Sequence, residues 1–140
     1  MKTILSIGAG VALLIGGVWW TNSLAKSDPD VLARNGMHSH PTLAIYVKGE
    51  KQEIPANIGI GATHSPMHTH TEDAAQGVVH LEFSGMVRTE DAMLGEFFKN
   101  WGKDMRSFGS NMRMTVNGVE NTEYERYIMR DKDVIELHYE

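Results

Sequence analysis

Five of the seven histidines take part in three pairings that we single out, each with another possible metal ligand two residues away. The pairings are His38 with His40, His68 with His70, and His80 with Glu82. In extended chain, residues i and i+2 point to the same face, so each pair can present two donors to one point. Neutral imidazole binds zinc and copper. We therefore predict a transition-metal site with His68, His70 and His80 as ligands. His40 or His38 would complete it, and Glu82 would be a ligand or accept a hydrogen bond from one.

The identity of the metal follows from the residues beside these pairs. Met37 precedes His38 and Met67 precedes His68, while the chain has no cysteine. A thioether is a good Cu(I) ligand and is of no use to zinc. Copper is therefore the first choice and zinc the alternative, although both methionines can equally be core filler. His138 shares a face with Glu136, and His64 has no paired partner nearer than His68, so both are expected to be ordinary surface or loop residues.

The N-terminal 25 residues predict export. The stretch between Lys2 and Lys26 carries no charge and ends its apolar run at Trp19 and Trp20. As a helix it is long enough for the roughly 30 Å hydrocarbon layer. Residues 1–25 are thus expected to form a single-pass transmembrane signal anchor, with a cleaved signal peptide as the alternative. Either way the remaining chain lies outside the cytoplasm: a polar tether over 26–36, then one domain over 37–140.

Composition limits the class of partner. Thirteen Lys and Arg stand against 18 Asp and Glu, giving a formal net charge of −5. No basic surface is therefore expected, which argues against nucleic acid as a partner. The expected partners are a metal ion, the membrane through the N-terminal helix, and a membrane or exported protein.

Apolar periodicity predicts the elements that position the histidines. Strict alternation indicates strands over 42–48, 78–84, 112–116 and 135–139, and apolar residues at helical spacing indicate one helix from Thr89 to Trp101. In the strand over 78–84, Val79 and Leu81 would face the core while His80 and Glu82 point together to the other face. This order predicts an α+β domain in which one helix packs on a single, mostly antiparallel sheet.

Two resemblances extend this reading. The last 30 or so residues resemble the final strands of β-grasp, ubiquitin-like domains, and a small cupin-like barrel is the alternative fold. The ordered blocks HSHP (38–41), IPANIGI (54–60), PMHTH (66–70), GVVHLE (77–82) and LGEFFKNWG (94–102) resemble an uncharacterised family of small exported or membrane-anchored domains. The resemblance implies that the six residues named above are its characteristic polar positions. The chain departs from the family at Thr71, where Asp is expected, and at Thr42, where His is frequent. Either a carboxylate that binds or supports the metal is missing from this chain, or Glu72 or Asp73 supplies it.

Three functions are consistent with this sequence. The favoured one is a histidine-rich copper-binding or copper-handling domain without enzymatic activity. A cupin-like metalloenzyme is disfavoured because Ala74 and Ala75 stand where a cupin glutamate is usual. The third is a β-grasp-like module that recruits a membrane partner, with the histidines incidental or acting as a pH switch.

Overall fold

The computed structural model describes residues 15–18 and 28–140. Within residues 28–140, ten strands form three sheets, accompanied by one α-helix over 94–101 and four short 3-10 turns. Residues 15–18 are helical, and the rest of the predicted membrane segment over 1–25 lies outside the described residues. Among the described residues no helix has both the length and the apolar character needed to cross a membrane.

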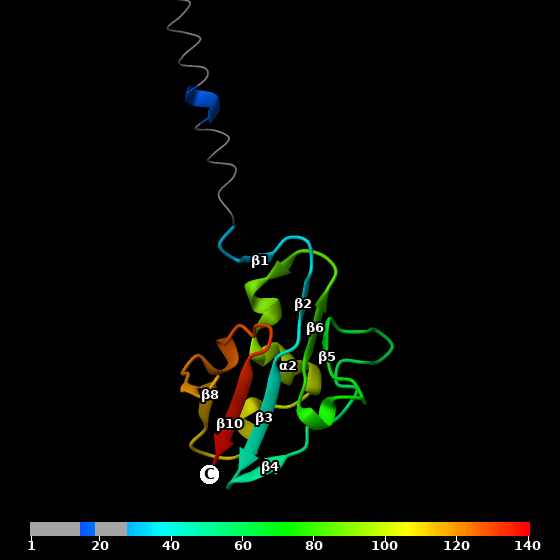
Figure 1. Ribbon diagram of the computed structural model, residues 1–140, viewed down its shortest axis with the longest axis vertical. Coiled ribbons are helices and arrows are strands. Elements are labelled where there is room, and N and C mark those ends of the chain that lie inside the picture. The colour runs from blue at the N-terminus through cyan, green and yellow to red at the C-terminus, as the bar shows by residue number, and fades with distance from the viewer. Residues whose placement is uncertain (1–14, 19–27) are drawn as a thin grey trace, which may run out of the picture.

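The largest sheet has five strands in the order β4-β3-β10-β8-β9. At its centre β3 (Thr42–Val47) and β10 (Val134–Tyr139) run parallel, side by side in Figure 1. The other pairs are antiparallel and involve β4 (Glu50–Gln52), β8 (Arg113–Val116) and β9 (Val119–Glu120). Alternate residues of the two central strands, including Leu43 and Ile135, are fully buried. The apolar alternation in these two segments thus predicted the buried face.

The second sheet has the order β2-β6-β5 and carries the histidine pairs. Its middle strand is β6 (His80–Phe83), flanked by β2 (Met37–Ser39) and β5 (Met67–His68), all antiparallel. Leu81 and Met67 are buried in the core cluster shared with the large sheet. Because side chains alternate along a strand, the opposite face is left to His80 and His68.

The third sheet is the two-stranded pair of β1 (Val31–Ala33) and β7 (Val87–Arg88). Strand β1 lies inside the segment 26–36 that was expected to be a polar tether. Its pairing with β7 is reinforced by the Thr89 amide, which donates to the Asp30 carbonyl at 2.8 Å. This part of the segment is therefore packed against the domain.

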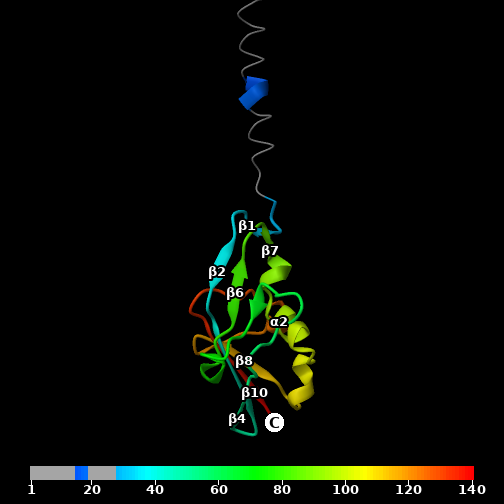
Figure 2. The same ribbon diagram turned by 90° about the vertical axis from the view of Figure 1, so that its right-hand side faces the viewer.

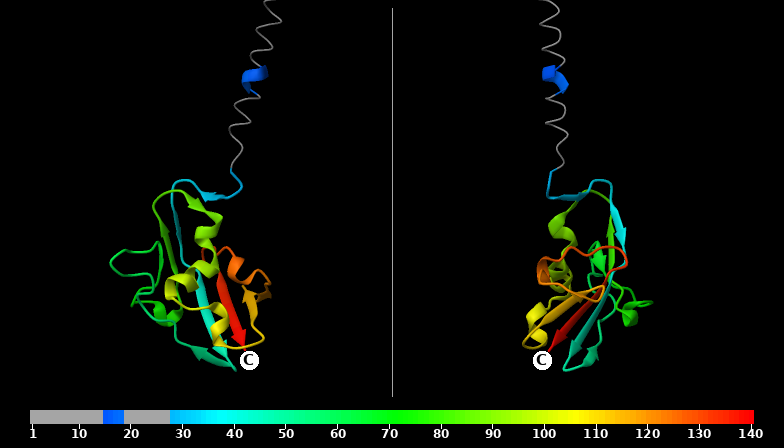
Figure 3. Two further views of the ribbon diagram at one scale, coloured as in Figure 1. Left: turned by 180° about the vertical axis from the view of Figure 1, so that it is seen from behind. Right: turned by 60° about the vertical axis from the view of Figure 1, so that its left-hand side comes forward.

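The helix α2 (Leu94–Trp101) covers the core on the side away from β2, as Figure 2 shows. Seen from behind in Figure 3, it lies over β3 and β10. Leu94, Phe97 and Phe98 enter the core cluster. The predicted start at Thr89 is five residues early, because the 3-10 turn η2 (Thr89–Ala92) precedes Met93, whose backbone is extended. The other 3-10 turns are η1 (Ala74–Gln76), η3 (Met105–Phe108) and η4 (Tyr124–Arg126).

The predicted fold class is wrong. The described part of the chain is mostly β, with three sheets instead of one, so neither the single-sheet, β-grasp-like fold nor the cupin-like barrel describes it. The chain changes sheets at His40 and Pro41, between β2 and β3. Alternation identifies the buried face of each strand but not its neighbour, so it could not separate the three-stranded sheet from the five-stranded one.

Candidate metal centre

Strand β6 brings the three predicted pairs onto one face. His38 lies opposite Glu82 on one side of β6, and His68 lies opposite His80 on the other. The register with β2 continues past the strand end, since Ser39 pairs with Leu81 and Thr42 bridges Val78. His40 therefore stands opposite His80, and their ring centroids are 4.8 Å apart. All six predicted residues meet at this face.

His68 is the most buried of these histidines, with 1% of its surface exposed. Its Nδ1 lies 2.9 Å from the carbonyl oxygen of Ser65, which accepts the ring N–H and leaves Nε2 with a free lone pair. Burial lowers the pKa of His68, and the neighbouring His64 and His70 lower it further, against the opposing effect of the Ser65 hydrogen bond. The ring is therefore neutral near pH 7, as a metal ligand must be.

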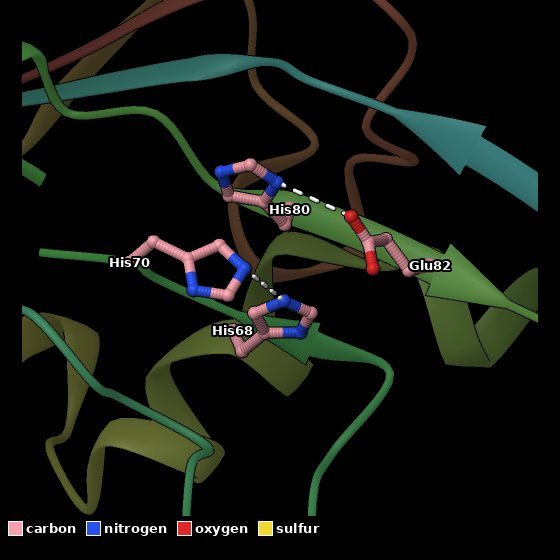
Figure 4. Close-up of side chains that lie close together, drawn as sticks. All are labelled: His68, His70, His80 and Glu82. Atoms are coloured by element: carbon pink, nitrogen blue, oxygen red, sulfur yellow. Dashed lines mark hydrogen bonds and ion pairs between the residues drawn. The ribbon is translucent and has the colours of Figure 1, made fainter. Parts of the chain in front are cut away.

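His70 presents its ring to His68 and His80 (Figure 4). Nε2 of His70 lies 3.0 Å from Nε2 of His68, and its ring centroid is 4.6 Å from that of His80. Two nitrogens this close either share one proton or face a common cation. Neighbouring nitrogens around a tetrahedral ion bound at about 2.0–2.1 Å lie roughly 3.3 Å apart, so the observed pair needs little movement to hold one.

His80 is held from behind by a carboxylate. Its Nε2 lies 2.8 Å from Oδ2 of Asp73, which accepts the ring N–H. The other ring nitrogen, Nδ1, is buried and makes no hydrogen bond within the described chain. A histidine whose far nitrogen donates to a carboxylate and whose near nitrogen is free is the usual arrangement of a metal ligand. A buried polar atom without a partner costs about 1–3 kcal/mol, which a bound cation would recover.

Glu82 stands between two histidines. Its Oε1 lies 3.4 Å from Nε2 of His38 and 3.5 Å from Nδ1 of His80. Partial burial acts to raise the pKa of Glu82, but the charges of His68 and His38, with the contact to His80, outweigh it and the pKa is lowered. The carboxylate is thus held in its charged form. Its side chain is 40% exposed, so solvent reaches it.

The ligand atoms form two groups within the described residues. His68, His70, His80 and Glu82 make one group, and His38, His40 and Glu82 make the other. Within each group all ligand atoms lie within 4.8 Å of one another. Glu82 belongs to both.

The distances between these ligand atoms are the basis on which we infer a function. Comparisons of the chain with protein-family models, curated proteins and solved structures give no match. The resemblance to the uncharacterised family therefore stays a prediction.

Thr69 fixes the back of the site. It lies between His68 and His70 in the sequence and is fully buried. Its hydroxyl donates to the Pro55 carbonyl at 2.8 Å and accepts from the Ile58 amide at 3.0 Å. Its own amide donates to the Ile58 carbonyl, and its carbonyl accepts from the Asn57 amide. The IPANIGI loop thus holds the backbone of residues 68–70 from the side opposite the imidazoles.

Two further contacts set the position of His68. Gly59 has a φ of +72°, and a Cβ there would lie 2.5 Å from the Met67 carbonyl oxygen and 3.3 Å from Cβ of His68. Asn100 of α2 donates to that same carbonyl at 3.0 Å and to the Ser65 hydroxyl at 2.9 Å. Ser65 in turn supplies the carbonyl that orients His68. The helix therefore acts on the site through Asn100, a role that no spacing in the sequence indicated.

Several expectations about neighbouring residues change. Asp73, expected only as a substitute carboxylate, contacts His80 directly. His64 is exposed, yet its ring centroid lies 4.5 Å from that of His68 at the rim of the site. Met67 is buried in the core and Met37 packs against it, so the thioether argument for Cu(I) loses its support. His138 stacks on Tyr46, on the five-stranded sheet.

Proposed function

We propose that this chain binds a divalent transition metal through His68, His70, His80 and Glu82. The observation that carries the proposal is the buried Nδ1 of His80, which makes no hydrogen bond to any described residue and lies next to two imidazoles and a charged carboxylate. Three imidazoles and one carboxylate suit Cu(II) and Zn(II), and Cu(II) binds such a donor set more tightly. Copper therefore remains the first choice, as Cu(II), with zinc second.

The role we infer is metal handling: binding, buffering or delivery to a partner outside the cytoplasm, beside the membrane to which the N-terminal segment would attach the domain. The two alternatives from the sequence depended on a cupin-like barrel and on a β-grasp fold. The described residues form neither, and no feature of the site favours catalysis over binding.

The test is metal binding by the full-length chain in detergent, purified free of metal. We expect at least one equivalent of Cu(II), and in a separate experiment Zn(II), to survive dialysis against a weak chelator at pH 7.5. The double variant His68→Ala, His70→Ala should lose this ion. His138→Ala is the matched control, because His138 lies outside the site. Retention of neither metal by the unmodified chain would refute the proposal.

A further inference from the structure

Glu82 is shared by two groups of ligand atoms, and this sharing bears on how many ions the face can hold. The inference rests on the proposed function, since it concerns a second ion beside the one held by His68, His70 and His80. In the second group, Nε2 of His38 lies 3.1 Å from Nε2 of His40 and 3.4 Å from Oε1 of Glu82. The three atoms converge as closely as those of the first group.

A single ion is unable to use all six side chains. Two ligands of one ion bound at about 2.0–2.1 Å are at most roughly 4.2 Å apart, when they lie on opposite sides of it. Within the described chain, His38 and His40 do not join His68, His70 and His80 in one group of mutually close ligand atoms. The site therefore has more imidazoles than one ion can use, divided into two sets by position.

The position of the Glu82 carboxylate fits a bridge. The same oxygen, Oε1, faces His38 on one side and Nδ1 of His80 on the other, at 3.4 and 3.5 Å. In two-metal sites the ions lie about 3.5–4 Å apart, a spacing that a carboxylate can span. Repulsion between two divalent ions requires compensating negative charge. Glu82 lies between the two positions and Asp73 lies behind His80. Asp131 accepts the His40 amide at 3.0 Å.

We propose that the domain holds two metal ions bridged by Glu82. The first is bound by His68, His70, His80 and Glu82, and the second by His38, His40 and Glu82. The second ion has one imidazole fewer, and its ligand His38 is 65% exposed. It is therefore the more weakly held and the more readily exchanged of the two.

The experiment is a Cu(II) titration of the full-length, metal-free chain in detergent. Bound copper is measured after equilibrium dialysis, and electron paramagnetic resonance spectra are recorded at each equivalent. We expect two equivalents, with an isolated Cu(II) signal growing over the first and broadening or disappearing over the second as the ions couple. The double variant His38→Ala, His40→Ala should bind one equivalent tightly and keep the isolated signal. Glu82→Gln should abolish the coupling.

Controls separate this inference from the proposed function. His138→Ala should behave as the unmodified chain, and thermal unfolding of each metal-free variant checks that it is folded. One tight equivalent in the unmodified chain, lost in the His68→Ala, His70→Ala variant, would overturn the two-ion inference and leave the proposed function standing. Two equivalents in the His38→Ala, His40→Ala variant would overturn it as well. Binding of neither Cu(II) nor Zn(II) would overturn both.

Discussion

Asp73 and His80 form a carboxylate–imidazole pair in which Nε2 of the ring lies 2.8 Å from Oδ2 of the carboxylate, while Nδ1 on the other side of the ring makes no hydrogen bond within the described part of the chain and lies 3.5 Å from Oε1 of Glu82. Because a carboxylate can only accept, Nε2 carries a proton, and in the neutral ring the lone pair of Nδ1 then points toward Glu82. Asp73 comes from the loop before η1, and His80 begins β6. The loop thus orients a ligand that the sheet positions.

Asp73→Asn should weaken metal binding without removing a ligand. The amide can still contact His80, but it carries no charge to increase the basicity of the ring. Loss of such a supporting contact lowers metal affinity about 10–100-fold. Competition with a chromogenic chelator measures the change. Glu72→Gln is the matched control, since it removes the neighbouring carboxylate and should leave affinity unchanged. Equal affinity of the Asp73→Asn variant and the unmodified chain would show that this pair does not support the site.

Gly59→Ala should destabilise the domain and displace His68. The new methyl group would meet the Met67 carbonyl at 2.5 Å, in a backbone with a φ of +72°. Gly49→Ala is the control: its φ is +84°, but nothing lies within 4 Å of the added carbon. Both variants carry backbone strain of about 1–3 kcal/mol. Any further decrease in the free energy of unfolding of Gly59→Ala is therefore due to the clash. Denaturant unfolding of both metal-free variants measures it, and metal affinity should fall only for Gly59→Ala. Equal losses would contradict the prediction.

The histidine pairs were predictable because the strand period of two places them on one face wherever the segment is extended. His80 and Glu82 on β6 were predicted in this way, and their neighbours Val79 and Leu81 are buried as the alternation required. The division of strands among sheets was beyond the same reasoning. Whether β6 pairs with β2 or with β3 depends on contacts distant in sequence. The supporting residues Ser65 and Asn100 were also missed, because a single serine or asparagine carries no periodic signal.

Tyr127 predicts how stability changes in alkali. Its buried hydroxyl donates to Oδ2 of Asp133 at 2.7 Å, and burial together with this bond raises the pKa of Tyr127 above its ordinary value of 10.0. The protonated form is therefore favoured by folding. The stabilisation is complete below pH 10 and is lost as the pH rises further, because the unfolded chain ionises first.

The free energy of unfolding of the metal-free chain should accordingly fall above pH 10, and Tyr127→Phe should make that fall shallower. Some fall will remain, because burial also raises the pKa of Tyr139. Tyr46→Phe is the control, since Tyr46 stacks on His138 and lies outside this hydrogen-bond network. Urea unfolding between pH 8 and 11 measures the slopes. The same slope in Tyr127→Phe and in the unmodified chain would contradict the assignment.

His68 and Glu82 predict how the stability of the metal-free chain changes in acid. The pKa of His68 is lowered from 6.5, mainly by burial, and that of Glu82 is lowered from 4.5 by the nearby histidine charges, which outweigh its own burial. In both cases the unfolded chain takes up a proton more readily than the folded one. The free energy of unfolding should therefore decrease as the pH falls below 6.5, with the contribution of Glu82 lost below 4.5.

Urea unfolding of the chelator-treated chain from pH 8 to pH 4 measures this decrease. The variant His68→Gln should remove the part of the decrease nearest pH 6.5, while His138→Gln should leave it in place. Because protons and metal compete for the same lone pairs, bound metal should be released over the same range. Constant stability from pH 8 to pH 5 in the metal-free chain would contradict the burial effect assigned to His68.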